Sequence, residues 1–190
     1  TCRWKVARRG RGRTTRAART SPIVRSAGTR LLWLPALLAI TALAGLNGLA
    51  GPLQFDDHLL AADRTTQDWS AWGDSLGRMV RPLLKASYVV SHGLGERLGD
   101  VPLGHHLFNL VIHLLVVVLA YRVARRLGQT VWRNMPGAGS RAAATGSAAV
   151  LALHPLATEA VTYLSGRSVA LATAGALAAL GNEAQALCGF

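Results

Sequence analysis

Two adjacent carboxylates, Asp56 and Asp57, stand in "GPLQFDDHLL" (residues 51–60), a few residues after an uncharged apolar run. Acidic residues are scarce: the chain of 190 residues has nine Asp and Glu and 21 Lys and Arg. Its formal net charge is +12. A carboxylate within hydrogen-bond reach of a hydroxyl can take its proton as a general base. The pair is therefore a candidate catalytic site. The alternative is that both residues cap or solvate the start of a loop.

Three further sets of polar side chains lie in or beside apolar segments, where an unpaired polar group is costly. They are Arg81 in "RPL", the set His106, Asn109 and His113 in "HHLFNLVIH", and His154, Glu159 and Arg167 in "LHPLATEAVTYLSGR". An Arg at a membrane interface can hold a phosphate with its planar fork, or contact lipid headgroups without a catalytic role.

The second set forms a polar stripe. Asn109 and His113 continue the spacing of His105, and His106 falls three residues before Asn109, so all lie on one helix face. Hydrogen bonds between helices are the plainer interpretation. No third convergent ligand is evident for a metal ion, so no metal site is predicted.

The third set contains a proline inside an apolar segment. Pro155 predicts a kink that frees backbone groups to line a cavity, and His154 and Glu159 are costly within a span unless they are paired or face water. The alternative is a kinked helix whose terminal Arg167 only reaches the interface.

The elements that must position these groups are apolar blocks of bilayer length. About 20 residues at ~1.5 Å rise span the ~30 Å hydrocarbon core. The blocks predict an all-α polytopic membrane bundle with about four spans, at residues 31–50, 104–121, 142–164 and 168–187.

An outer loop, residues 53–103, separates the first two spans and is predicted to hold interfacial amphipathic helices. Trp69 and Trp72 suit a membrane interface, and Val80, Leu83, Leu84 and Tyr88 recur at helical spacing. Pro82 is expected in the first turn of that helix, and the Gly-rich stretch that follows is expected to end it.

Charge predicts the orientation. Residues 1–30 hold ten Lys or Arg and residues 122–141 five, both without an acid, whereas residues 53–103 carry seven of the nine acids. The positive-inside rule places the N-terminus in the cytoplasm and the outer loop on the other side.

Residues 1–30 are interpreted as a disordered cytoplasmic flank rather than a nucleic-acid arm or transit peptide, so no nucleic-acid partner is predicted. A cleaved signal peptide is disfavoured, since the apolar run that follows exceeds a usual h-region. The only cysteines, Cys2 and Cys188, provide no CxxC motif or disulfide framework. The missing initial Met and the polar ending "GNEAQALCGF" predict a fragment, with residues 31–190 forming a partial membrane domain.

The order "FDD", Trp-containing loop, "RPL", "HHLFN" and "HPLATEAV…GR" resembles the N-terminal membrane region of the transmembrane and tetratricopeptide-repeat O-mannosyltransferases, over residues 55 to about 172. The resemblance implies a GT-C fold, a polyprenyl-phosphate sugar as donor, more spans, and tetratricopeptide repeats beyond this chain. It implies Asp56 as catalytic base and Asp57 as its support. Donor-phosphate contacts would be Arg81 and Arg167, and the site wall would be His106, Asn109, His113, His154 and Glu159.

Two departures from the family pattern matter. The usual "YRPL" reads "VRPL" here, and the further spans are absent, which leaves open whether this piece closes a donor site.

The expected function is inverting transfer of a sugar, mannose by the resemblance, to Ser or Thr hydroxyls of an acceptor protein on the non-cytosolic side. No other cofactor is expected. Membrane lipid, the lipid-linked donor and the acceptor are the expected partners, in a bacterial inner membrane or the endoplasmic reticulum. The alternatives are a non-enzymatic anchor or scaffold of a repeat protein, and a transporter fragment with Glu159 as its one candidate charge.

Overall fold

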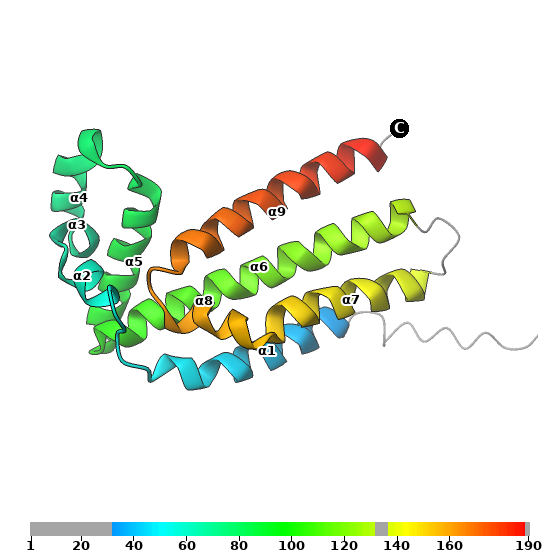
Figure 1. The fold of residues 1–190 in the computed structure, drawn as a ribbon, viewed down its shortest axis with the longest axis horizontal. Coiled ribbons are helices and arrows are strands. Elements are labelled where there is room, and N and C mark those ends of the chain that lie inside the picture. The colour runs from blue at the N-terminus through cyan, green and yellow to red at the C-terminus, as the bar shows by residue number, and fades with distance from the viewer. Residues whose placement is uncertain (1–31, 132–136, 189–190) are drawn as a thin grey trace, which may run out of the picture.

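The computed structural model describes residues 32–131 and 137–188, and every regular element in these ranges is a helix. The all-α prediction is confirmed, and the basic residues 1–30 lie outside the described ranges. Long helices α1 (Trp33–Leu49), α7 (Gly137–Leu153) and α9 (Arg167–Cys188) run beside the central α6 (Val101–Val131) (Figure 1). The shorter helices that follow α1 gather at one end of this bundle.

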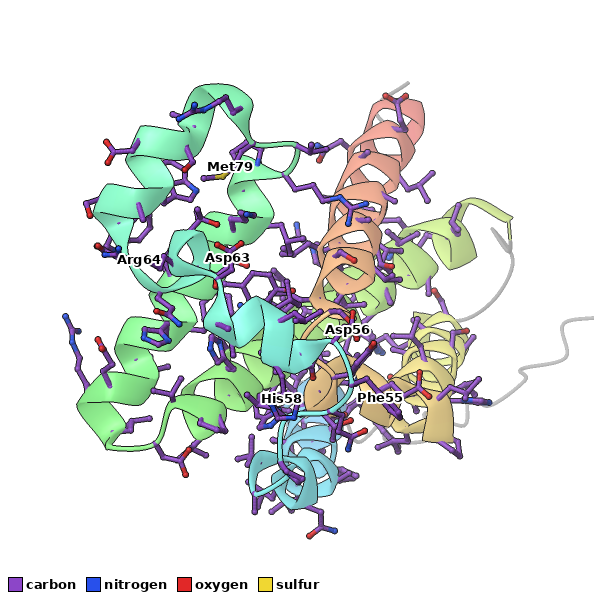
Figure 2. The ribbon with its side chains drawn as sticks, turned by 60° about the vertical axis from the view of Figure 1, so that its left-hand side comes forward. Phe55, Asp56, His58, Asp63, Arg64 and Met79 are labelled. Carbon is purple, nitrogen blue, oxygen red and sulfur yellow. The ribbon has the colours of Figure 1, made fainter. Side chains whose placement is uncertain are left out.

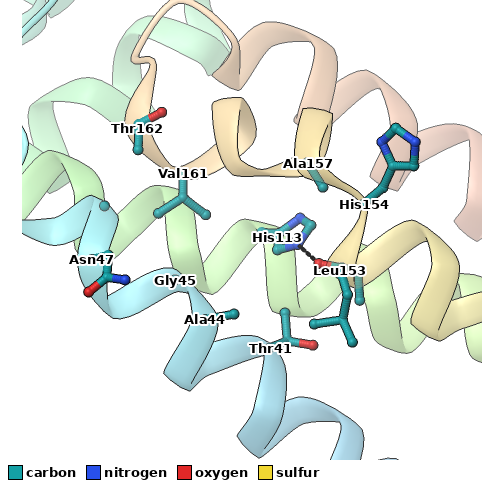
Figure 3. A pocket seen from close by; sticks show the side chains of 12 residues that line it. Thr41, Ala44, Gly45, Asn47, His113, Leu153, His154, Ala157, Val161 and Thr162 are labelled. Atoms are coloured by element: carbon teal, nitrogen blue, oxygen red, sulfur yellow. Dashed lines mark hydrogen bonds between the residues drawn. The ribbon is translucent and has the colours of Figure 1, made fainter.

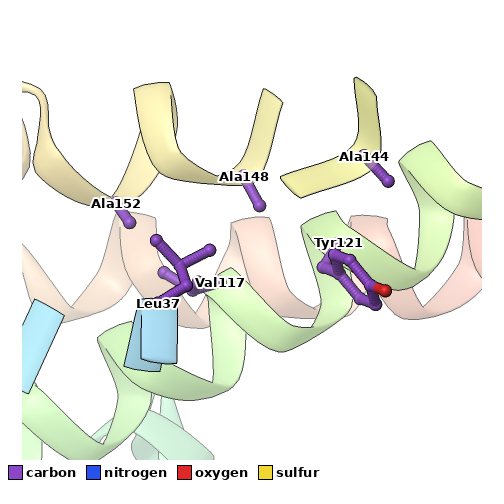
Figure 4. Packing of buried hydrophobic residues seen from close by; sticks show 6 residues of the cluster. All are labelled: Leu37, Val117, Tyr121, Ala144, Ala148 and Ala152. Atoms are coloured by element: carbon purple, nitrogen blue, oxygen red, sulfur yellow. The ribbon is translucent and has the colours of Figure 1, made fainter. Parts of the chain in front are cut away.

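The core lies where α1, α6 and α7 meet. Its buried side chains come from all three helices and are Leu37, Val117, Tyr121, Ala144, Ala148 and Ala152 (Figure 4). The three alanines recur every four residues and form one face of α7. Small residues on a facing stripe let helix backbones approach closely, so α7 packs near the larger side chains of α6.

One helix among the described residues is long and apolar enough to cross a membrane, Val101–Gln129. The bent pair Pro155–Thr162 and Arg167–Glu183 adds a second only if the two helices are taken as one span. Helix α1 is apolar and has 17 residues, at the lower limit of the roughly 17–25 that a span uses, and is shorter than a typical span of ~20. The structure thus supports one or two of the four predicted spans.

The predicted third span, residues 142–164, is not one helix. Helix α7 ends at Leu153, and His154 adopts an extended conformation with ψ 137°. A 3-10 turn, η3 (Pro155–Thr158), and a short α8 (Glu159–Thr162) follow before α9 begins. Proline disfavours the helical conformation in the residue before it and lacks an N–H, so Pro155 ends the helix where a kink was predicted.

The outer loop folds into a series of helices, two of which are capped by aspartates of the loop. It contains α2 (Asp57–Ala62), α3 (Arg64–Gln67), α4 (Trp69–Ser75), η2 (Leu76–Arg78) and α5 (Pro82–Leu98). The carboxylate of Asp63 accepts from Thr65 N at 2.9 Å at the start of α3, and that of Asp68 from Ser70 N at 3.0 Å at the start of α4. Side-chain oxygens at these positions satisfy free N–H groups of the first turn.

Helix α5 begins with Pro82 in its first turn, as predicted, but it is longer than predicted and is not an interfacial helix along its length. It continues through Gly93 and Gly95 and ends at Gly99, whose φ of 76° is left-handed. Its Tyr88 and Val89 are buried.

Two glycines allow α5 to cross α6 at backbone distance. A Cβ at Gly104 would lie 2.6 Å from the Ser91 carbonyl oxygen, and one at Gly95 would lie 2.5 Å from Val101 Cα. Neither contact can be relieved by a side-chain rotation, because the obstructing atoms are backbone. The Gly-rich stretch therefore serves both purposes: Gly95 and Gly104 allow close helix packing, and Gly99 ends α5 as predicted.

Gly104→Ala should destabilise the fold by about 1–3 kcal/mol, the usual cost of overpacking a tight contact. Gly93→Ala is the matched control, since a Cβ there meets nothing within 4 Å and alanine favours the helix. Thermal unfolding followed by circular dichroism in detergent measures both. Equal melting temperatures for the two variants would show that the α5–α6 contact is looser than described.

Candidate active site

The turn after α1 presents Asp56 at the end of the bundle that carries the short helices (Figure 2). Phe55, just before it, adopts φ 48°, a left-handed conformation that residues other than Gly rarely take. Its ring is 84% exposed, so packing of the side chain does not impose this conformation. Asp56 is exposed, and one of its carboxylate oxygens accepts a hydrogen bond from the Tyr163 hydroxyl.

Asp57 has the opposite environment. It is completely buried, and its two carboxylate oxygens accept from Leu164 N at 3.0 Å and Ser165 N at 3.1 Å. These amides lie just before α9, so Asp57 ties the turn after α1 to the segment between α8 and α9. The two neighbouring carboxylates thus differ: one is available to solvent and one is an internal anchor.

Tyr163 was missed by the sequence analysis. The hydrogen bond to Asp56 raises the pKa of its phenol, so the hydroxyl stays protonated and continues to donate at neutral pH. Its position inside "EAVTYLSGR" is the only signal in the sequence. Nothing local connects it to a carboxylate 107 residues earlier.

The polar stripe of α6 binds the backbone around the broken helix. His106 lies 3.2 Å from the Val161 carbonyl oxygen through Nδ1 and 3.0 Å from that of Gly51 through Nε2. Asn109 donates to the carbonyls of Val161 and Tyr163, both at 3.3 Å. These side chains therefore occupy carbonyls near the break, which keeps the α8–α9 connection and Tyr163 in place.

Arg167 lies at the centre of the interface between α5, α6 and α9, and its side chain is 0% exposed. Its Nε donates to Asn109 Oδ1 at 2.7 Å, and Nη1 donates to the Ser87 carbonyl and to Ser91 Oγ, both at 2.9 Å. Nη2 donates to the His105 carbonyl at 3.2 Å. The structure thus places Arg167 within the fold, where a donor phosphate has no access, and not beside Asp56 at the surface.

Aromatic rings complete the enclosure of Arg167. Its guanidinium carbon lies 4.3 Å from the ring centroid of Tyr88 and 5.0 Å from that of Phe108. The Tyr88 hydroxyl donates to the Leu164 carbonyl at 2.8 Å, beside the amides that hold Asp57. Burial raises the pKa of the Tyr88 phenol to about 12, with the negative charges of Asp57 and Asp56 adding to the rise. Tyr88 therefore remains a donor at physiological pH.

Arg81 is exposed and lines a cavity of about 700 Å³ between the start of α5 and residues 168–173 of α9. A second cavity, of about 300 Å³, contains Glu159 and Tyr163. Val169 and Thr173 line both, so the two cavities flank one ridge of α9. The structure places Arg81 on one side of this ridge, and Tyr163, which holds Asp56, on the other.

A third cavity, of about 310 Å³, opens between α1, α6 and the break after α7 (Figure 3). His113 lines it and lies 3.2 Å from the Ala152 carbonyl oxygen through Nε2, while His154 is exposed and accepts from Leu156 N at 3.2 Å. Among the described residues, no group of three or more His, Cys, Asp or Glu side chains is placed to hold a metal ion.

The chain is similar to three curated protein O-mannosyl-transferases. It is 35% identical to Tmtc2 and 36% identical to Tmtc1 of Drosophila melanogaster, each over 88 residues, 46% of this chain but 8% and 9% of those proteins. It is 27% identical over 172 residues to F38B6.6 of Caenorhabditis elegans, covering 82% of this chain and 23% of that protein. The chain thus spans less than a tenth of the two fly relatives. No family model and no solved structure matches it.

Replacing Arg167 by Met should lower stability by about 2 kcal/mol or more, because buried acceptors on Asn109, Ser87 and His105 lose their donor. Arg97→Met is the control, since Arg97 is exposed at the end of α5. Thermal unfolding in detergent measures both variants. If Arg167→Met has the same melting temperature as Arg97→Met, the buried guanidinium does not hold these helices together.

Proposed function

We propose that this chain forms the N-terminal part of a protein O-mannosyltransferase site on the non-cytosolic face of a membrane. Mannose would pass from a polyprenyl-phosphate donor to a Ser or Thr hydroxyl of an acceptor protein. The observation that carries the proposal is the pairing of an exposed Asp56, held by Tyr163, with a buried Asp57. The similarity to proteins named as O-mannosyl-transferases supports the choice of reaction.

In the proposed reaction Asp56 accepts the proton of the acceptor hydroxyl as its oxygen attacks the anomeric carbon. The new carbon–oxygen bond forms as the bond to the lipid phosphate breaks, and the phosphate leaves with the bonding electrons, so the anomeric configuration inverts. Tyr163 orients the Asp56 carboxylate, and Asp57 fixes the turn that carries it.

Arg81 is the proposed contact for the donor phosphate. It is exposed, it lines a cavity with the first turns of α9, and it lies at the same end of the bundle as Asp56. Arg167, which the resemblance also implied for the phosphate, has no part in the proposal, because its donors already bind protein acceptors. His106 and Asn109 support the backbone behind Tyr163.

The membrane placement is part of the proposal. Helix α6 would span the bilayer, with the short helices at its first residues on the non-cytosolic side. Arg122, Arg125 and Arg126 lie toward the other end of α6, which agrees with the positive-inside rule.

Asp56→Asn should lower mannosyl transfer by about 100-fold or more, since general base catalysis contributes on that order. Stability should not change, because Asp56 is exposed. Asp57→Asn is the matched comparison: it should lower the melting temperature, because a buried carboxylate that accepts two amides is lost. Transfer from a radiolabelled polyprenyl-phosphate mannose, by the full-length natural protein in membranes, measures activity. Undiminished turnover in Asp56→Asn would exclude it as the base.

Tyr163→Phe removes the hydroxyl that orients the Asp56 carboxylate. Mannosyl transfer should therefore fall by about 10- to 100-fold, since misplacing a reacting group costs on that order, while the melting temperature stays close to that of the unchanged protein. Tyr121→Phe is the control, because Tyr121 lies in the core of the bundle away from Asp56. Unchanged transfer would exclude Tyr163 as a positioning residue, and a lower rate that comes with a clearly lower melting temperature would mean that Tyr163 only supports the fold.

A further inference from the structure

Residues 76–84, which comprise η2, the connection after it and the first residues of α5, form an exposed corner, and the proposed reaction uses only Arg81 from it. Val80 is 92% exposed and Leu83 is 83% exposed, so two apolar side chains at this corner are largely open to their surroundings. Arg78 and Arg81 beside them are exposed too. Pro82 starts α5 here and restricts the backbone, which makes the corner a fixed feature rather than a loose loop.

The height of the corner along the bundle follows from its neighbours. Residues 81–84 line one cavity with residues 168–173 of α9. Helix α9 runs beside α6: Arg167 donates to the His105 carbonyl near the start of α6, and Arg126 near its other end donates to the Gly181 carbonyl (Figure 1). Residues 168–173 are therefore level with the second and third turns of α6. If α6 spans a bilayer, the corner lies at the depth of the outer leaflet.

The charges at the corner are positive and mostly uncompensated. Arg78, Arg81 and Lys85 line a cavity of about 420 Å³ with Thr65 and Ser75. Lys85 pairs with Asp63 at 2.8 Å. In the part of the chain that the structure describes, neither Arg78 nor Arg81 makes an ion pair. Two guanidinium groups thus flank an apolar tip, the pattern of side chains that insert into a membrane while their cations remain at the headgroups.

We propose that residues 76–84 dock into the outer leaflet, with Val80 and Leu83 among the acyl chains and Arg78 bound to the phosphate of an anionic phospholipid. Arg81 remains available for the donor phosphate. This inference rests on the membrane placement of α6 given under Proposed function, and it adds a second attachment to that membrane. Such a contact fixes the height of the outer helices, and so of the turn that bears Asp56, relative to the lipid surface.

The test uses the chain in vesicles, with Cys2 and Cys188 replaced by Ser and one new cysteine labelled with bimane. Val80→Cys and Leu83→Cys report on the corner. Val111→Cys is the control for lipid exposure, because Val111 is exposed on α6, and Asp74→Cys is the control for water, because Asp74 is exposed on α4. Lipids with a shallow doxyl group and aqueous iodide are the two quenchers.

We expect the label at positions 80 and 83 to be quenched by doxyl lipid and not by iodide, as at position 111. At position 74 we expect the opposite, quenching by iodide and not by doxyl lipid. Quenching at positions 80 and 83 by iodide, with position 111 still quenched by doxyl lipid, would overturn the docking of residues 76–84 and leave the membrane placement of α6 intact. Iodide quenching at 111 as well would overturn the placement itself, and with it the proposed function. Protection of positions 80 and 83 from both quenchers would mean that a protein partner or a second copy of the chain covers the corner. That result would also overturn the proposal.

Arg78→Gln tests the headgroup contact. In the Val80→Cys protein, phosphatidylglycerol added to phosphatidylcholine vesicles should increase quenching by doxyl lipid, because the cation draws the corner inward. Arg78→Gln should abolish this increase. Arg97→Gln, which removes an exposed charge at the far end of α5, should keep it. An equal increase in both variants would overturn the role of Arg78.

Discussion

The guanidinium of Arg167 lies where α5, α6 and the first turn of α9 meet, and the arrangement of the outer end depends on its hydrogen bonds. No carboxylate pairs with it at ion-pair distance among the described residues, so acceptors from Asn109, Ser87, Ser91 and His105 and two aromatic rings compensate the charge. A buried charge is expensive unless such partners are all present. Only one relative position of the three helices provides them, so the charge selects that position.

A path of contacts leads from this interface to the surface. Tyr88, under the guanidinium, binds the Leu164 carbonyl, and the amides of Leu164 and Ser165 bind Asp57. Asp56 follows directly in the chain and is held by Tyr163 from the same short segment. A deeply buried arginine and an exposed carboxylate are thus joined through one cation–π contact and a few hydrogen bonds.

Parts of this arrangement could be predicted from the sequence, because they depend on local patterns. The apolar block around α6, the helix break at Pro155 and the shared face of His106 and Asn109 each follow from composition or periodicity. Other parts could not. The motif "GR" suits an interfacial arginine as well as a buried one, and only tertiary contacts decide for Arg167. The pairing of Asp56 with Tyr163, and the packing of α5 on α6 through Gly95 and Gly104, join segments whose local sequences carry no mark of one another.

The left-handed conformation of Phe55 affects the orientation of the Asp56 carboxylate next to it. A left-handed residue other than glycine costs on the order of 1 kcal/mol and persists only where its surroundings determine it. Here Asp57, two residues after Phe55, is bound to the amides of Leu164 and Ser165 and constrains the turn. In the proposed reaction the Asp56 carboxylate would therefore be preorganised: its orientational entropy is lost once, when the chain folds, and not again with each acceptor that arrives.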